Sequence, residues 1–243
     1  MFLKKFQSHI TLLLIFVTLG LSAQTTTPSV TELFKNSKAF YSKQPVFKCD
    51  LTYTLFRNKQ NPIIIEKYTG FMAKNGPKMY SKINQTEYLL VGNEYIKVNH
   101  LQKAIEYVKG NSANMGNPLE IEQYLKYFAK QKVYDDHKYW RCELSTPKLT
   151  QLPYGSIIFY FSKKDFSINK QVLELVSPGS IVDESGKLTP DRKYLKIDVY
   201  NFEAPQILDK NYFMTSNFVI HAGNSVKVSP KFNSYKMIDR STN

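Results

Sequence analysis

Alternating apolar and polar residues fill the stretch from Ile63 to Lys109. Two turn-forming tripeptides interrupt them, Asn-Gly-Pro at 75–77 and Val-Gly-Asn at 91–93. Alternation with a period of two predicts strands that bury one face, and Asn-Gly is a favoured hairpin turn. Short connections make sequential strands neighbours in a sheet. The stretch therefore predicts an antiparallel meander, with strands at about 63–74, 78–84, 86–91, 94–99 and 103–108.

Further strands are predicted on both sides of this meander. Before it, the residues from Phe47 to Arg57 alternate throughout, which predicts a strand with one buried and one wet face. Gly70, inside the meander, predicts a bend that curls the sheet. After the meander, strands are predicted at about 133–135, 138–146, 155–163, 168–177, 192–202 and 217–221. A long polar loop over 177–193 and a poorly patterned tail over about 222–243 complete the chain.

Two amphipathic helices are predicted beside these strands. Ser29 and Glu32 form a capping box at the start of a helix over residues 29–41, whose apolar residues fall on one face. Asn117, followed by proline, caps a second helix that ends at about residue 130. We expect the apolar side of each helix to pack on the sheet.

The first residues form a targeting segment. Lys4 and Lys5 precede an apolar core, and Leu-Ser-Ala at 21–23 forms a small-residue cleavage site. The apolar run is too short to span a bilayer. We therefore expect a cleaved signal peptide over residues 1–23, one domain over 24–243, and export to the periplasm, with secretion as the alternative.

The charge of the chain is strongly basic but dispersed. The formal charge is +13, or +11 once Lys4 and Lys5 are removed. The chain has no run of five basic residues, so no nucleic-acid-binding arm is predicted. The charge favours anionic lipid head groups or other acidic envelope surfaces as partners. The alternative is that the lysines only solvate the outer faces of strands.

The two cysteines of the chain, Cys49 and Cys142, each lie on the apolar phase of a predicted strand. An oxidising compartment permits a single disulfide between them. Two small buried thiols are the equal alternative, because a sequence does not give the distance between the two Cβ atoms.

No motif for catalysis stands out. The sequence contains no nucleophile elbow, phosphate-binding loop or dinucleotide-binding motif. Asp-Asp-His at 135–137 is the densest polar cluster, and we interpret it as a turn because it lacks further partners at metal-ligand spacing. Glu87, Glu94 and Glu106 lie on neighbouring predicted strands and are expected on their wet face. We predict no enzyme activity, no metal and no cofactor.

The apolar phases of the strands are therefore the main candidate for a functional surface. A curved sheet that is covered by helices can enclose a hydrophobic cavity, which is a usual place for an apolar ligand. The same side chains can instead fill a solid core. Alternation alone does not distinguish these two arrangements.

A set of turn and strand residues carries a resemblance to a known family. They are Gly70, Phe71, Lys74, Pro77, Lys78, Tyr80, Val91, Gly92, Asn93, Glu94, Tyr95, Asn117, Pro118 and Leu119. With the order of the elements, they resemble the periplasmic lipoprotein-carrier family, LolA and its LolB-like relatives, over roughly residues 28–201. The resemblance implies a half-barrel with a helical lid that binds acyl chains, and lipoproteins or envelope proteins as partners.

Together these features predict an α+β, β-dominated fold. Its centre is a strongly curved antiparallel sheet, a half-barrel, with two or more helices on its concave face. The predicted function is non-enzymatic carriage of a lipid, lipoprotein acyl chain or other hydrophobic ligand. The alternative is an interaction module of the cell envelope with a solid core. The residues expected to line the cavity are Phe71, Met79, Leu89, Val91, Ile96, Val98, Trp140, Phe159 and Phe161.

Overall fold

The structure, a computed structural model, describes residues 26–110, 125–146, 154–176, 180–182, 186–223 and 225–241. The predicted signal peptide and most of the predicted second helix lie outside these ranges. Within them, no helix is long and apolar enough to cross a membrane.

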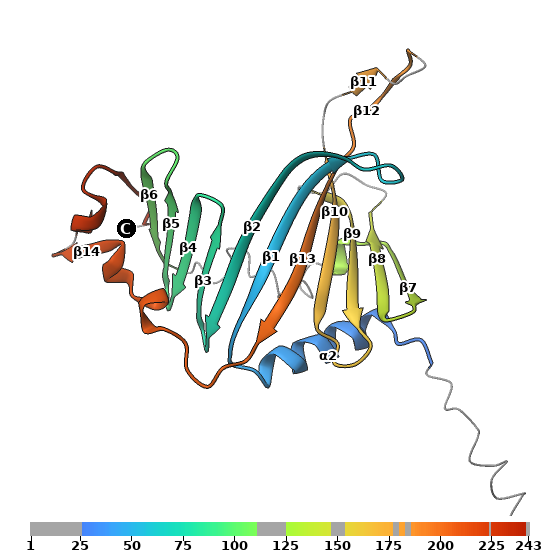
Figure 1. The fold of residues 1–243 in the computed structure, drawn as a ribbon, viewed down its shortest axis with the longest axis horizontal. Helices are drawn as coiled ribbons and strands as arrows, with labels where there is room; N and C mark the ends of the chain where they lie inside the picture. Colours follow the sequence, from blue (N-terminus) through green and yellow to red (C-terminus); the bar gives the residue numbers. More distant parts are fainter. Residues whose placement is uncertain are drawn as a thin grey trace, which may run out of the picture.

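One sheet of 12 strands dominates the described part of the chain (Figure 1). Its order is β16-β6-β5-β4-β3-β2-β1-β13-β10-β9-β8-β7. All neighbours are antiparallel except β16 and β6, which are parallel. The strands are β1 (Val46–Arg57), β2 (Ile63–Asn75), β3 (Lys78–Ile83), β4 (Thr86–Val91), β5 (Glu94–Asn99), β6 (Ala104–Lys109), β7 (Lys130–Asp136), β8 (Tyr139–Ser145), β9 (Tyr154–Ser162), β10 (Ile168–Leu175), β13 (Lys193–Glu203) and β16 (Lys236–Asp239).

The meander predicted from the sequence is confirmed. Strands β2 to β6 follow one another as neighbours, with ends within about two residues of those predicted. Gly76 and Gly92 form two of the turns with φ of 58° and 61°. Glycine enters this left-handed region without the steric cost that a Cβ imposes. Local turn chemistry therefore sets the register of this half of the sheet.

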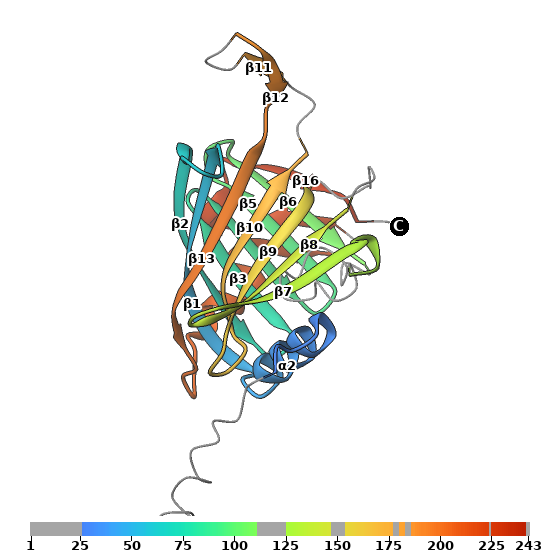
Figure 2. The same cartoon turned by 90° about the vertical axis from the view of Figure 1, so that its right-hand side faces the viewer.

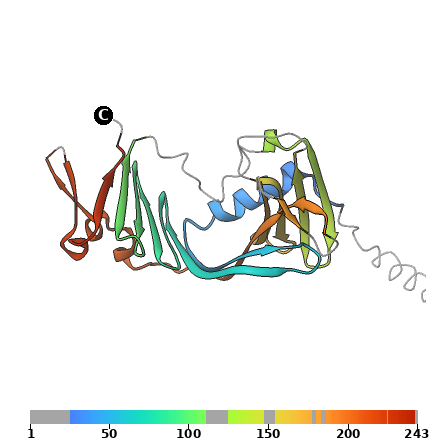
Figure 3. The ribbon, with the colours of Figure 1, turned by 90° about the horizontal axis from the view of Figure 1, so that it is seen from above.

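The sheet is strongly curved and open, so that it forms a trough (Figures 2 and 3). The helix α2 (Val30–Ser42) lies inside the trough, and we call the face that it covers the concave face. The predictions of a β-dominated fold and a curved sheet are confirmed. The prediction of two or more helices is not, because α2 is the one α-helix among the described residues.

The start of α2 is fixed by the capping box that the sequence predicts. The Glu32 backbone N–H donates to Ser29 Oγ at 3.2 Å, and the Ser29 N–H donates to Glu32 Oε2 at 2.7 Å. The apolar side of α2 then packs on β8 to β10 and β1. The ring of Phe34 meets those of Phe159 and Phe161 edge-on, with centroids 5.3 Å apart in each pair. These contacts form the first hydrophobic core.

Ser29→Ala is expected to lower the free energy of unfolding by about 1 kcal/mol, because the first turn of α2 loses its side-chain acceptor. Urea denaturation followed by circular dichroism measures the change. The control is Ser42→Ala at the other end of α2, where the side chain is exposed and caps nothing at the N-terminus. Equal effects of the two substitutions would show that the capping box contributes nothing.

The segment after β13 forms a separate layer on the sheet. It contains η3 (Lys210–Phe213), η4 (Thr215–Asn217), β14 (Val219–Ala222), β15 (Ser225–Val228), η5 (Pro230–Phe232) and finally β16. We call this the C-terminal segment. It packs on the face of β3 to β6 opposite the concave face, which we call the back face (Figure 3).

The C-terminal segment and the back face enclose a second hydrophobic core. Its buried residues are Ala73, Tyr80, Leu89, Ile96, Val98, Ile105, Tyr107, Leu208, Phe213, Phe218, Val219 and Phe232. The tail that has little sequence pattern thus supplies a structural layer. The predicted polar loop over 177–193 contains a short hairpin of β11 (Ser180–Val182) and β12 (Leu188–Pro190), which projects from the sheet (Figure 2).

Candidate functional site

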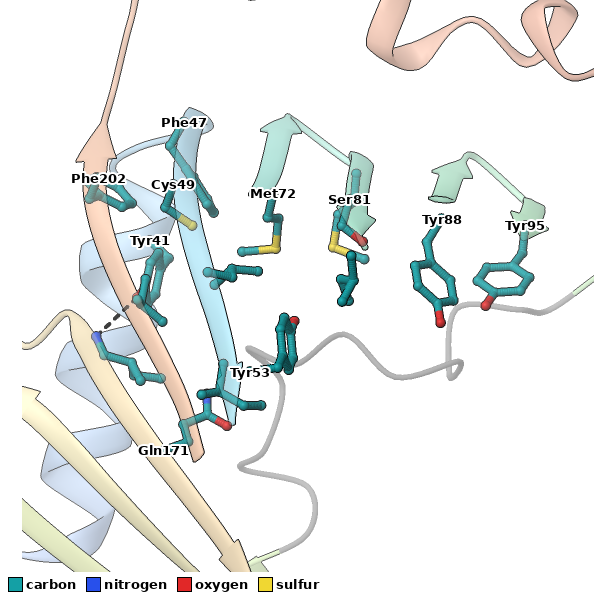
Figure 4. A pocket seen from close by; sticks show the side chains of 16 residues that line it. Tyr41, Phe47, Cys49, Tyr53, Met72, Ser81, Tyr88, Tyr95, Gln171 and Phe202 are labelled. Carbon is teal, nitrogen blue, oxygen red and sulfur yellow. Dashed lines mark hydrogen bonds between the residues drawn. The ribbon is translucent and has the colours of Figure 1, made fainter. Parts of the chain in front are cut away.

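A cavity of about 490 Å³ lies on the concave face, beside α2 (Figure 4). Its walls come from α2 and from strands β1 to β5, β10 and β13. The described residues that line it are Tyr41, Phe47, Cys49, Leu51, Tyr53, Met72, Met79, Ser81, Ile83, Tyr88, Tyr95, Ile168, Gln171, Ile197, Val199 and Phe202. None of these side chains is a carboxylate, lysine, arginine or histidine, so the cavity offers an apolar surface edged by hydroxyl groups.

Strand register explains why these side chains converge. Alternate residues of β1 point into the trough, and Cys49 lies opposite Met72 on β2. Met72 lies opposite Ser81, and Ser81 lies opposite Tyr88. The four side chains therefore form a row across the floor of the cavity, and Figure 4 shows them pointing to the same side. Ser81 is the smallest member of the row, and it leaves space between Met72 and Tyr88.

The polar groups of the lining are held neutral. The Tyr41 hydroxyl accepts a hydrogen bond from the Ile168 backbone N–H at 3.1 Å. Burial raises the pKa of Tyr41, of Tyr53 and of the Cys49 thiol to about 12 in each case. A thiol with this pKa stays protonated at neutral pH and is a poor nucleophile. Such a lining suits an uncharged apolar ligand rather than covalent chemistry.

Both cysteines are free thiols in the structure, and both are buried. Cys49 lines the cavity. Cys142 belongs to the first core and is also protonated at neutral pH, because burial raises its pKa to about 12. The arrangement corresponds to the second of the two sequence alternatives, a pair of small buried residues.

The structure separates the nine residues expected to line the cavity into three groups. Met79 lines the cavity. Trp140, Phe159 and Phe161 lie deeper in the trough, in the first core, and are at most 5% exposed. At this end of the concave face, α2 packs directly on the sheet.

The other five expected residues belong to the second core on the back face. Leu89, Ile96 and Val98 are buried in it, and Phe71 and Val91 pack against it. Their neighbours in sequence, Tyr88 and Tyr95 among them, line the cavity instead. Successive residues of a strand point to opposite faces, so a shift of one residue exchanges the two sets. The sequence signal that could have assigned the faces is the strand register set by the 75–77 turn, which places Ser81 opposite Met72.

The Asp-Asp-His cluster at 135–137 forms only part of the turn that the sequence predicts. Asp135 and Asp136 are the last residues of β7, and His137, at φ 48°, begins the turn to β8. Asp135 pairs with Lys163 from the neighbouring strand connection. Among the described residues, no group of three His, Cys, Asp or Glu side chains is arranged to hold a metal ion.

The expectation that the meander glutamates lie on a wet face is wrong for Glu87. Its carboxylate is only 12% exposed, on the back face. Tyr80 donates a hydrogen bond to it at 2.6 Å, and His100 Nε2 lies 2.7 Å away. The other ring nitrogen of His100 is 2.9 Å from the hydroxyl of Tyr235 in the C-terminal segment. This chain of polar contacts ties the segment to the sheet.

The other two meander glutamates also contact the C-terminal segment. Glu94 accepts a hydrogen bond from Tyr107 at 2.7 Å and lies 3.1 Å from His221 Nε2. Glu106 pairs with Arg240 at 3.0 Å. Both carboxylates are less than one-quarter exposed. The acids of the meander therefore hold the outer layer in place instead of solvating a free face.

Glu87→Gln is expected to lower the free energy of unfolding at pH 7 by about 1–3 kcal/mol, because hydrogen bonds to a charged acceptor are lost. Burial alone raises the pKa of Glu87, but the hydrogen bonds from Tyr80 and His100 outweigh it and hold the pKa below its ordinary value. The stabilisation is therefore complete above the unfolded-state pKa of about 4.3 and is lost as the pH falls through the lower folded-state value.

Urea denaturation between pH 7 and pH 3 measures this dependence, and the difference between wild type and Glu87→Gln should shrink below about pH 4. The control is Glu66→Gln. Glu66 accepts a similar hydrogen bond from Tyr68 at 2.6 Å, but it is exposed. Glu66→Gln should lower the free energy of unfolding by at most about 0.5 kcal/mol. If the difference in unfolding free energy between wild type and Glu87→Gln did not change with pH, the charge of Glu87 would not be the source of the stabilisation.

No family model matches the sequence, and no curated protein matches it. Similar solved structures include a DUF1329 family protein from Desulfovibrio piger, with 13% identity, a TM-score of 0.40, and 78% of this chain and 99% of that chain covered. An uncharacterized conserved protein from Thermus thermophilus has 9% identity and a TM-score of 0.44, covering 86% and 98%. A LolA superfamily protein from Nitrosomonas europaea has 10% identity and a TM-score of 0.36, covering 77% and 98%.

The resemblance that the sequence predicts, to LolA-like proteins, thus recurs among the solved structures. What the protein binds has to be inferred from the cavity itself.

Proposed function

We propose that the protein is a non-enzymatic periplasmic binding or carrier protein for a lipid or another ligand with an acyl chain. The observation that supports this most directly is the apolar cavity of about 490 Å³ on the concave face. Ligand pockets in proteins usually measure about 300–1,000 Å³, are mainly apolar and carry a few polar groups that orient the ligand. The Tyr53, Tyr88 and Tyr95 hydroxyls provide such groups here.

An acyl chain gains affinity in this site through its methylene groups. Each methylene that leaves water contributes about 0.8 kcal/mol. The cavity contains no charged side chain among its described residues, so no buried charge opposes the entry of the chain. A charged head group would stay at the mouth of the trough. The net charge of +11 that remains after the predicted signal peptide is removed favours an anionic head group there.

Binding of a fluorescent fatty acid tests this proposal. The purified chain without residues 1–23 is expected to enhance the emission of a long-chain probe that lights up in apolar surroundings, at a stoichiometry of one. An unlabelled fatty acid of the same length should displace it, whereas a short-chain acid should not. Organic extraction of protein purified from the periplasm should yield lipid.

Absence of both probe binding and extracted lipid would favour the alternative, an interaction module of the cell envelope. The packing of Trp140, Phe159 and Phe161 into the first core is the kind of arrangement that such a module requires. The apolar cavity beside this core is what a carrier requires, and because of it we prefer the carrier function to the interaction module.

A further inference from the structure

Strand β2 extends beyond its neighbour β3, and the part without a neighbour is exposed. β3 pairs with β2 only over Gly70–Asn75, whereas β1 pairs with β2 as far as Ile63. All residues of β2 from Ile63 to Thr69 are exposed. Figure 1 shows this half of β2 rising past the ends of β3 and β4. No other described strand pairs with it on this side, and we call it the β2 edge.

Gly70 marks the point where β2 and β3 part. A Cβ on Gly70 would clash with the backbone carbonyl oxygen of Lys82, so the two backbones approach closely only because the side chain is absent. The last bond between the strands runs from the Asn84 N–H to the Thr69 carbonyl at 3.1 Å. Backbone groups alternate in direction along a strand, so the N–H and C=O of Lys67 point to the same open side.

Among the described residues, the β2 edge carries charge only at Glu66 and Lys67, so it is lightly protected for an exposed sheet edge. Proteins normally shorten such edges, place charges or proline along them, or cover them. Here Ile63, Ile64 and Ile65 are 64%, 59% and 39% exposed, and Tyr68 is 37% exposed. A long apolar edge with unpaired backbone groups is a template for another strand.

A second cavity, of about 280 Å³, lies where the β2 edge meets the ends of the neighbouring hairpins. It is lined by Tyr68, Ile83, Asn84, Gln85, Thr86, Tyr88, Asn99 and Leu101. Leu101 is 79% exposed beside it. The volume suits one or two side chains, and the side-chain amides offer hydrogen bonds at the rim. The edge therefore has a pocket next to it, on the side of the concave face.

We propose that the β2 edge binds an extended segment of another polypeptide as an added strand. Only a polypeptide matches the alternating backbone donors and acceptors of a strand, and pockets beside the edge then select its side chains. An apolar side chain of the partner enters the 280 Å³ cavity. Lys67 points to the opposite side of the sheet by alternation, so an acidic side chain of the partner faces it.

A second copy of this chain fits the β2 edge poorly. Antiparallel pairing about a two-fold axis places one residue opposite its own copy. The two registers that use most of the edge place Glu66 opposite Glu66, or Lys67 opposite Lys67. Like charges directly opposite each other are destabilising. The edge is therefore suited to a different partner, one that carries acidic and apolar residues in alternation.

The probe for this proposal is the peptide Val-Glu-Val-Glu-Val-Thr-Val, acetylated and amidated. Its binding is measured by fluorescence anisotropy with a terminal dye, and amide hydrogen exchange of the protein locates it. We expect saturable binding and slower exchange at Lys67. A version of the peptide with alternate backbone nitrogens methylated should not bind, because it cannot form the ladder.

Three protein variants separate the backbone contribution from the charge contribution. Lys67→Pro removes one outward-pointing backbone N–H. An edge strand tolerates proline at such a position, and the substitution should weaken peptide binding by more than about tenfold. Lys67→Glu should weaken binding of the glutamate peptide about fivefold and strengthen binding of a peptide with Lys in place of Glu. Lys59→Glu, in the exposed β1–β2 turn, makes the same charge change off the edge and should have no effect.

Several results would overturn the proposal. One is equal binding of the methylated and unmethylated peptides, and another is no peptide binding at millimolar concentration. A dimer in sedimentation that Lys67→Pro dissolves would assign the edge to a second copy. Retention on phosphatidylglycerol vesicles that Ile64→Ser abolishes, without peptide binding, would assign it to a membrane surface. The fatty-acid assay tests the concave cavity independently, so failure of one proposal leaves the other intact.

Discussion

Phe232→Ala is expected to lower the free energy of unfolding by about 3–5 kcal/mol. The side chain of Phe232 is 3% exposed at the centre of the second core. Its ring stacks on Phe218 at 5.9 Å and meets Tyr235 edge-on at 4.9 Å. Truncation to alanine leaves a cavity between the C-terminal segment and the back face, and both lose contacts. Urea denaturation followed by circular dichroism measures the change.

The control for Phe232→Ala is Ser234→Ala, which changes an exposed side chain two residues further along. It should shift stability by no more than about 0.5 kcal/mol. Fatty-acid binding by folded Phe232→Ala should match the wild type, because Phe232 lies on the far side of the sheet from the concave cavity. If Phe232→Ala lowers the free energy of unfolding as little as Ser234→Ala does, the C-terminal segment contributes no stability to the sheet.

The elements that the sequence predicts well are those that short-range chemistry determines. Ser29 and Glu32 satisfy each other's backbone groups across one turn, so four residues are enough to locate the start of α2. Gly76 and Gly92 need left-handed backbone angles that follow from the turns themselves. Alternation then defines the strands between them. None of these signals requires knowledge of a distant part of the chain.

The face that each strand turns to the cavity depends on distant parts of the chain. In β4, Tyr88 and Leu89 are both large and partly or wholly apolar, so either phase could be the buried one. The structure buries Leu89 beneath the C-terminal segment and half-buries Tyr88 in the wall of the cavity. When both faces of a strand carry large, partly apolar side chains, alternation does not show which face points to the cavity.

Except for the strand predicted at 217–221, which corresponds to β14 (Val219–Ala222), the C-terminal segment escapes prediction for a related reason. Its strands have four residues each, and its 3-10 turns have three or four, too short for a period to emerge. Phe218 and Phe232 are buried because they meet the back face of strands more than 100 residues earlier in the chain. The contacts that order the segment are therefore non-local, and the sequence shows only scattered aromatic residues.

Ser81→Trp is expected to abolish or strongly weaken fatty-acid binding without destabilising the fold. Ser81 lies on the floor of the cavity between Met72 and Tyr88, and its side chain points into the empty space (Figure 4). An indole there occupies volume that the ligand needs. Displacing only two methylenes of an acyl chain removes about 1.6 kcal/mol, which is more than tenfold in affinity.

The neighbour of Ser81 supplies the control that gives this result its meaning. Lys82→Trp places the same indole on the same strand, but on the back face at an exposed position, and should leave affinity unchanged. Ser81→Trp should match or exceed wild-type stability, because it fills a cavity instead of creating one. Unchanged binding by a folded Ser81→Trp would place the ligand outside the concave cavity. Equal loss in both variants would implicate strand β3 rather than the space above it.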